Sequence, residues 1–127
     1  MNEISNAELV VLNLLWQRGA LTSAQAVEAL QQTDAGKDWH EKTIKTLLSR
    51  LVKKQAIGFE KQGRGYCYFP LLEQESYQRQ ASHSFIDRLF SGRLAPLVAG
   101  FAKDKSLTAE DAAELQKLLD EWKDNNA

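Results

Sequence analysis

The stretch HEKTIKTLLSRLVKKQAIGFEKQGRGYCYFP, residues 40–70, contains two different residue patterns, one directly after the other. Its first half repeats apolar residues at spacings of three and four, which predicts an amphipathic helix over 40–55. Its second half has the two-residue alternation of a strand on both sides of 62–65, where glycines indicate a tight turn. A helix followed at once by a hairpin restricts the fold that the rest of the chain can complete.

The predicted helix over 40–55 is cationic on the side opposite its apolar residues. Short hydroxyl side chains lie between the cations, and no carboxylate lies near the centre of this side. Cations suit phosphate oxygens, and Thr and Arg suit the edges of bases, so this is the chemistry of a DNA-binding surface. A lysine-rich face that only keeps the protein in solution is the alternative. The candidate DNA-binding residues on or beside this face are Lys42, Thr43, Lys45, Thr46 and Arg50.

The predicted turn places Arg64 between two glycines, which leaves its guanidinium exposed at the tip of the hairpin. Arg64 is therefore a further candidate DNA-binding residue, although it can also be no more than a turn residue. Strand alternation favours Tyr66 and Tyr68 as residues of the hairpin's core rather than as platforms for bases. It favours Cys67, between them, as a buried small hydrophobe rather than a reactive thiol.

The upstream sequence predicts two more helices. Ser5 and Glu8 have the spacing of a capping box, and the apolar helix that they open ends at Gly19. Thr22 and Gln25 repeat that spacing after a stretch short enough to form only a small edge strand. The predicted fold is therefore mainly α, a winged helix-turn-helix of three helices and a two- to three-stranded wing over residues 1–71. In such a module the third helix enters the major groove and the wing touches the adjacent backbone.

Residues 72–127 have a purely helical pattern and are predicted to form a helical dimerisation region. So short a set of amphipathic helices has to cover its apolar faces, either on a second copy of the chain or on the winged-helix module. Pairing is favoured, because helix-turn-helix proteins commonly read two half-sites through their own twofold symmetry. The candidate dimerisation residues are Tyr77, Phe85, Leu89, Leu115, Leu118, Leu119 and Trp122.

The net charge of the 127-residue chain is −1, but the charges are unevenly distributed. Residues 37–64 contain eight Lys or Arg residues and three acids, a local charge of +5, whereas residues 72–127 contain seven and ten, a local charge of −3. A local basic patch is what attracts nucleic acid, and the total charge hides it. The chain has no long apolar run and no basic, apolar start, so we expect a cytoplasmic protein without membrane insertion.

The sequence contains no arrangement of residues typical of a catalytic site, so we expect no enzyme activity and no cofactor. A single cysteine excludes a disulfide framework within the chain and any C-x-x-C metal pair, and no metal site is predicted. His40, at the start of the predicted third helix, can contact phosphate or can cap the helix.

Four stretches of the chain resemble the bacterial penicillinase-repressor family (BlaI/MecI/CopY). They are ISNAELVVLNLLW (4–16), KTIKTLLSRL (42–51), GRGYCYFP (63–70) and SFIDRLFSG (84–92). The resemblance implies a homodimeric winged-helix repressor that binds an inverted-repeat operator of the TACA/TGTA type through helix 40–55 and the wing at 62–65. It implies DNA-binding roles for Lys42, Thr43, Thr46, Arg50 and Arg64. The alternative is a winged-helix protein–protein interaction module without sequence-specific DNA binding.

The same resemblance bears on regulation. Beta-lactam-responsive members of the family are cleaved at an Asn-Phe bond, and Gly100-Phe101 stands at that place here, so the aromatic residue is kept and the asparagine is lost. Gly100 and Phe101 are therefore a candidate proteolytic site, and a separate membrane sensor-protease is a candidate partner. Copper-responsive members carry C-x-C pairs at the carboxy terminus, and this terminus contains no cysteine.

Overall fold

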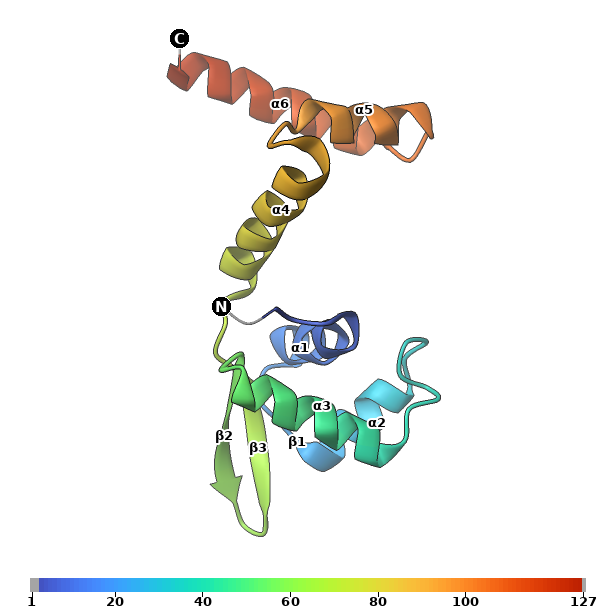
Figure 1. Cartoon of the computed structure of the whole chain (residues 1–127), viewed down its shortest axis with the longest axis vertical. Helices are drawn as coiled ribbons and strands as arrows, with labels where there is room; N and C mark the ends of the chain where they lie inside the picture. Colours follow the sequence, from blue (N-terminus) through green and yellow to red (C-terminus); the bar gives the residue numbers. More distant parts are fainter. Residues whose placement is uncertain (1–2, 127) are drawn as a thin grey trace. The chain divides into compact units, whose positions relative to one another are not determined.

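The computed structural model describes residues 3–126, and the chain divides into two compact units, residues 1–78 and residues 79–127. The first unit contains three helices, a small sheet and the start of a fourth helix, and the remaining helices follow along the chain (Figure 1). The fold is mainly helical, with one antiparallel sheet, as the sequence predicts. The helices of the first unit are α1 (Asn6–Arg18), α2 (Ser23–Gln31) and α3 (Glu41–Lys53).

Both predicted capping boxes are present. At the start of α1 the backbone N–H of Glu8 donates to the Ser5 hydroxyl at 3.2 Å, and the backbone N–H of Ser5 donates to the Glu8 carboxylate at 2.8 Å. Thr22 and Gln25 make the same reciprocal pair at the start of α2. Each box satisfies backbone N–H groups that have no partner within the helix, which is why both helices begin where they do.

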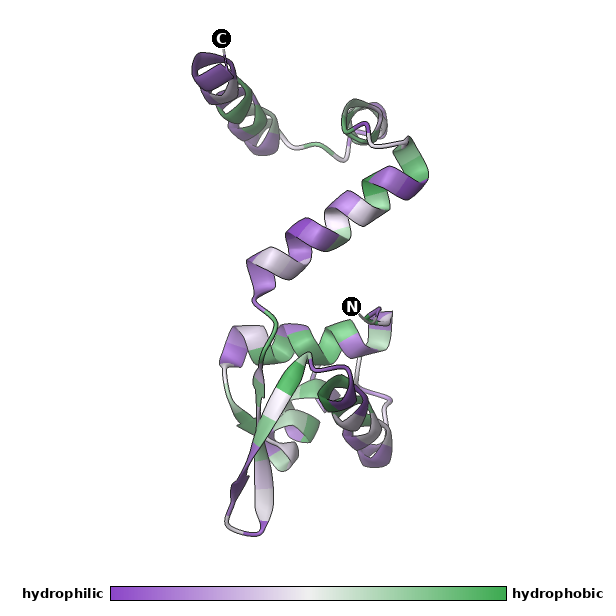
Figure 2. Ribbon diagram, turned by 60° about the vertical axis from the view of Figure 1, so that its left-hand side comes forward, coloured by the Kyte–Doolittle hydropathy of each residue, from purple (hydrophilic) through white to green (hydrophobic). Residues whose placement is uncertain are grey.

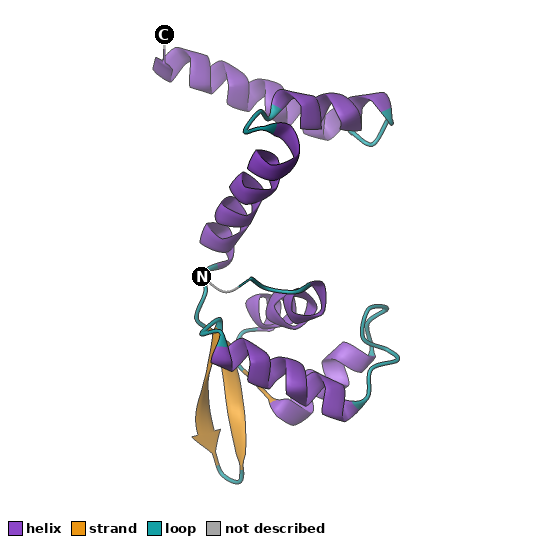
Figure 3. Ribbon diagram, in the orientation of Figure 1, coloured by secondary structure: helices purple, strands orange, loops and turns teal. Residues whose placement is uncertain are grey.

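The sheet has three antiparallel strands in the order β1-β3-β2, drawn in orange in Figure 3. The Cα partners Gln62 and Gly65 leave a two-residue turn of Gly63 and Arg64. Gly63 has a φ of +59°, and positive φ at the first central residue alone is typical of the II′ turn, which suits the twist of a hairpin. The strands are β1 (Leu21–Thr22), β2 (Ile57–Gln62) and β3 (Gly65–Pro70).

The core of the first unit lies between its three helices and the base of the β2–β3 hairpin. Leu12, Leu15 and Leu48 are among the residues that are fully buried there, and Ile57 joins the hairpin to this core. The unit also includes the chain that follows β3, because the indole N–H of Trp16 donates to the carbonyl of Leu72 at 2.8 Å. This topology, with the edge strand β1 completing the sheet, is the predicted winged helix-turn-helix.

The helices that follow the sheet are amphipathic, and several of their large apolar side chains are exposed. None of the described residues of these helices is buried. In Figure 2, hydrophobic and hydrophilic segments alternate along the helix that ends at the C-terminus. Within residues 3–126 no helix combines the length and the hydrophobicity that crossing a membrane requires. The three helices are α4 (Gln74–Phe90), α5 (Ala95–Lys103) and α6 (Ala109–Asn126).

Candidate nucleic-acid interface

The third helix, α3, has one buried side and one exposed side, as its sequence pattern predicts. Four apolar residues, Ile44, Leu47, Leu48 and Leu51, are at most 5% exposed and join the core. Because the apolar side of this amphipathic helix is buried in the core, its opposite, polar side faces solvent. The residues exposed on α3 are Glu41, Lys42, Thr43, Lys45, Thr46, Ser49, Arg50 and Lys53. The five candidate DNA-binding residues of the helix are therefore all accessible.

His40 is the N-cap of α3, and its side chain has a structural task. Its Nδ1 accepts a hydrogen bond from the backbone N–H of Lys42 at 3.0 Å, which satisfies one of the free amides at the start of the helix. The capping role is therefore the one that the structure supports for His40. The cap also fixes the first turn of α3, where Lys42 and Thr43 begin the exposed side.

Glu41 is the one acidic residue of α3, and it is paired within the helix. Its carboxylate lies 2.9 Å from the ammonium group of Lys45, one helical turn away. The hydrogen bond from Lys45, together with the charge of that group, lowers the pKa of Glu41 below its ordinary value. Both side chains are more than half exposed, so water screens this pair and Lys45 can exchange it for a phosphate.

Thr46 has a fixed side-chain geometry on the exposed side of α3. Its hydroxyl donates to the backbone carbonyl of Lys42 at 2.9 Å. The hydroxyl proton is thereby used within the helix, so the oxygen, which keeps two lone pairs, can act toward another molecule only as an acceptor. Such an oxygen can accept from the exocyclic amine of adenine or cytosine, and the methyl group can contact that of thymine.

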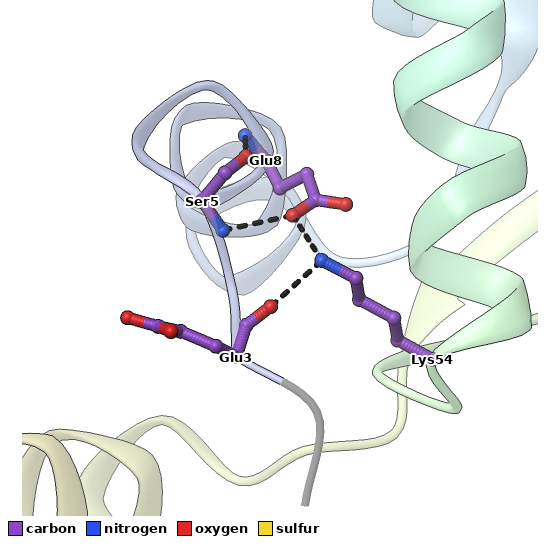
Figure 4. A network of polar contacts seen from close by, with 4 residues as sticks. All are labelled: Glu3, Ser5, Glu8 and Lys54. Carbon is purple, nitrogen blue, oxygen red and sulfur yellow. Dashed lines mark hydrogen bonds and ion pairs between the residues drawn. The ribbon is translucent and has the colours of Figure 1, made fainter.

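Lys54 belongs to the basic stretch by sequence but not to this exposed side. Its ammonium group donates to the Glu8 carboxylate at 2.6 Å and to the backbone carbonyl of Glu3 at 2.7 Å (Figure 4). The cation is thus used to hold the chain before α1 against the end of α3. Sequence reasoning missed this, because Glu8 and Lys54 are 46 positions apart and no local pattern connects them.

The wing is exposed at its tip and anchored at its base. Arg64 is exposed in the two-residue turn, as predicted, and Lys61 is exposed on the adjoining strand. Tyr68 packs against the core, in agreement with its predicted role in the core of the hairpin. Tyr66 is 45% exposed, so the same prediction is wrong for this residue. Its place near the tip, beyond the reach of the helices, is the physical reason.

The predicted dimerisation residues differ in their surroundings. Phe85 is 41% exposed, whereas Leu89, Leu118, Leu119 and Trp122 are between 53% and 63% exposed. Leu115 is half-buried. A row of large apolar side chains that a single copy leaves in water is typical of a surface that another molecule covers.

Tyr77 is the predicted dimerisation residue whose side chain has a partner in the first unit. Its ring lies 5.8 Å from that of Trp16, centroid to centroid, and it packs against the core. Gly100 and Phe101, the candidate proteolytic site, lie in the C-terminal half of α5, where Phe101 is 50% exposed. Among residues 3–126, no group of three or more His, Cys, Asp or Glu side chains could hold a metal ion.

Known proteins resemble this chain over nearly its whole length. The sequence pattern described as "Penicillinase repressor" matches residues 4–121. The penicillinase repressor of Bacillus licheniformis is 35% identical over 121 residues, which cover 95% of this chain and 92% of that protein. The methicillin resistance regulatory protein MecI of Staphylococcus aureus (strain N315) is 32% identical over 117 residues, covering 92% and 93%.

A solved structure resembles the winged-helix part of the chain. It is the solution structure of the Bacillus licheniformis BlaI monomeric form in complex with the blaP half-operator, and it is 34% identical. The match has a TM-score of 0.50 and covers 60% of this chain and 89% of that one. The fold, the exposed side of α3 and the agreement with these relatives along the chain lead to one conclusion: the chain belongs to the penicillinase repressor family.

Proposed function

We propose that this chain is a homodimeric transcriptional repressor that binds an inverted-repeat operator of the TACA/TGTA type. In this proposal α3 lies in the major groove and the wing at 62–65 contacts the adjacent backbone. The observation that carries it is the exposed side of α3, where cations and hydroxyls surround a single carboxylate that is already paired. The similarity to BlaI, whose monomeric form is known in complex with a half-operator, supports it.

The roles of the individual residues follow from their chemistry. Lys42 and Lys45 are point charges suited to phosphates, whereas Arg50 has the planar fork that can bind guanine with two hydrogen bonds. Thr43 and Thr46 bring small polar groups to base edges. Arg64, exposed at the tip of the wing, contacts the sugar-phosphate backbone and so adds affinity without reading sequence.

Residues 72–127 pair two copies of the chain in this proposal, and residues 1–71 bind DNA. An inverted repeat presents two symmetric half-sites, which a twofold dimer reads with one copy each. The exposed apolar side chains of α4 and α6 support this pairing, because large exposed apolar side chains are typical of a surface that another molecule covers.

Relief of repression by proteolysis is part of the same proposal. The bond between Gly100 and Phe101 is the candidate site, and a separate membrane-bound sensor-protease is the candidate partner. The exposure of Phe101 supports access, although a protease has to unwind α5 locally to reach the bond. The repressor itself acts in the cytoplasm, where its operator is.

The experiment that tests the proposal measures binding to a duplex that carries the inverted repeat and to a random duplex, over a range of salt concentrations. Arg64→Ala should weaken binding to both duplexes and reduce the salt slope of the dimer by about two, because each copy loses one phosphate contact. Thr46→Ala should cost about 1–3 kcal/mol for each base contact that is lost and relax the preference at one or two positions of each half-site. Lys103→Ala, a charge removed from α5, is the control and should bind like the parent.

The alternative is a winged-helix module that binds protein through α3 and the wing. Such a module would show little salt dependence with DNA and no preference for the inverted repeat. If the parent behaves in that way, or if Thr46→Ala and Arg64→Ala bind both duplexes like the parent, the assigned DNA-binding residues are wrong.

A further inference from the structure

One face of the wing carries a row of three aromatic rings that begins in the core and continues onto the surface. Tyr68 packs against the core, and the ring of Phe59, its cross-strand partner, lies 6.3 Å from it between centroids. Tyr66 meets Phe59 edge to face, with the ring centroids 5.2 Å apart. Phe59 is 49% exposed and Tyr66 is 45% exposed.

The two exposed rings of this row, Phe59 and Tyr66, are not needed to attach the hairpin to the helices. Ile57 and Tyr68 already attach the hairpin to the helices. Phe59 and Tyr66 cover each other in part and leave about half of each residue in water. Adjacent exposed rings on a hairpin invite unwanted association, so such a patch is typical of a surface with a partner.

The charges around the exposed rings identify the chemistry of that partner. Lys61 is directly opposite Tyr66 in the register, so it shares the face with the rings, and Arg64 follows at the tip. Glu60, the one acid of the two strands, alternates onto the other face, where its Cα partner is Cys67. Phe59, Tyr66, Lys61 and Arg64 thus form a strip that is apolar in the middle, positive at its end and free of carboxylates.

The position of the strip on the hairpin also supports DNA as the partner. The face that packs on the helices at its base, through Tyr68, continues along the hairpin to Tyr66 and Lys61 near the tip. Figure 1 shows the β2–β3 hairpin projecting beyond the helices of this unit. A duplex that lies along the exposed side of α3 and reaches Arg64 runs beside the hairpin that carries this strip. Deoxyribose rings are the apolar part of a DNA backbone, and phosphates flank them.

We propose that Phe59 and Tyr66 contact the deoxyriboses of the minor groove next to the major groove that α3 enters, while Lys61 binds a flanking phosphate. This inference rests on the proposed function and adds to it. The rings fit against the walls of the groove, so they respond to its width rather than to base identity. Phe59 and Tyr66 are then positioning residues for the wing, and they set how far Arg64 reaches along the backbone.

Hydroxyl-radical footprinting tests this contact, because the radical attacks deoxyribose in the minor groove. The probe is a duplex with the TACA/TGTA-type inverted repeat, compared for the parent, Phe59→Ala, Tyr66→Ala and Arg64→Ala. The matched control is Leu71→Ala, which removes an apolar side chain that is 57% exposed. Leu71 lies beside Gly58, which alternates with Phe59 and so belongs to the other face of the hairpin. Thermal unfolding of each free variant shows whether it is folded.

Phe59→Ala and Tyr66→Ala should each lose protection at a few deoxyriboses per half-site and bind roughly five-fold more weakly. Their salt slope should stay at the parent's value, because the lost contact is apolar, whereas that of Arg64→Ala should fall. Leu71→Ala should keep every protected position. If Phe59→Ala is unfolded, Tyr66→Ala, at the tip, decides the matter.

Three outcomes would overturn the inference. If the parent footprints the repeat and folded Tyr66→Ala protects the same sugars with the same affinity, the rings do not contact DNA, and the proposed function stands. If either ring variant changes the oligomeric state of the free protein, the strip is a contact between copies instead. If the parent leaves no footprint at all, the proposed function fails together with this inference.

Discussion

Glu8 and Lys54 form an ion pair that is buried on one side only. The Glu8 side chain is 2% exposed, and its second oxygen, Oε2, has no hydrogen-bond partner within the described residues, whereas the Lys54 side chain is 26% exposed. A buried carboxylate is stable only when its charge is compensated. At this scale, a single cation keeps the charge of Glu8 compatible with the core.

Lys54→Met should therefore destabilise the protein by about 3 kcal/mol, because it leaves the Glu8 carboxylate buried without its cation. The double variant Glu8→Gln with Lys54→Met should recover part of that loss, since it removes the charge as well. Urea denaturation measures both free energies of unfolding. If the double variant is as unstable as Lys54→Met alone, the buried charge is not the cause.

Glu8 also predicts how stability depends on pH. Burial raises the pKa of Glu8, but hydrogen bonds from Lys54 and Ser5 and the charge of Lys54 outweigh it, so the pKa lies below 4.5 in the folded protein. A lowered carboxylate pKa contributes stability that is present above the unfolded value and is lost as the pH falls through the folded one.

Glu8→Gln should accordingly be less stable than the parent near neutral pH, and the difference should shrink as the pH falls below 4.5. Urea denaturation at a series of pH values measures this difference. If the difference in the free energy of unfolding between the parent and Glu8→Gln stays constant down to acid pH, ionisation of Glu8 contributes nothing to stability.

At the scale of elements, the end of α3 is strained at one residue. Gln55 follows the C-cap with a φ of +64°, a conformation that favours glycine. The backbone N–H of Ala56 donates to the carbonyl of Leu51 at 3.0 Å and that of Gln55 to Val52 at 2.9 Å, which is the Schellman pattern. These hydrogen bonds fix the path of the chain from α3 into β2. They require a positive φ at Gln55, which residues other than glycine disfavour.

Gln55→Gly should stabilise the protein by about 0.5–1 kcal/mol, because relief of the positive φ exceeds the entropy that glycine gains in the unfolded chain. Gln32→Gly is the matched control: Gln32 is the C-cap of α2 with a φ of −88°, so glycine should bring no gain there. Urea denaturation compares both with the parent. Equal effects of the two changes would contradict a role for backbone strain at Gln55.

At the scale of the whole molecule, the two units differ in how they bury apolar surface. The first unit has a core of its own, whereas the helices that follow it have no buried residue in the described chain. The proposed function needs two copies, and the second unit supplies large apolar side chains that are about half exposed or more, among them Leu89, Leu118 and Trp122. In the proposed function, this division lets one part read DNA while the other sets how many copies act together.

Leu118→Glu should weaken the proposed dimer at least about ten-fold, because a leucine in each copy is replaced by a charge that has to be desolvated. Leu71→Glu is the matched control, since both leucines are 57% exposed in the single chain and Leu71 belongs to the first unit. Sedimentation over a range of concentrations measures association. If Leu118→Glu associates as strongly as the parent, this face of α6 does not take part in the dimer.

Local patterns in the sequence were enough to predict the elements and the exposed side of α3. The capping boxes at Ser5 and Thr22, the two-residue turn at Gly63 and the period of the apolar residues all involve groups at most one helical turn apart. Their geometry is therefore set before distant parts of the chain meet. The division at 1–71 and 72–127 and the individual site residues remain predictions.

Contacts between distant residues were decided only by the tertiary structure. The sequence alone determined that Lys54 is a cation in a basic stretch, but packing of α1 against α3 brought it to Glu8. Packing likewise joined Tyr77 to Trp16 and left Tyr66 exposed beyond the helices. The physical reason is that charge and hydrophobicity belong to a residue, whereas its partner depends on which surfaces meet when the chain folds.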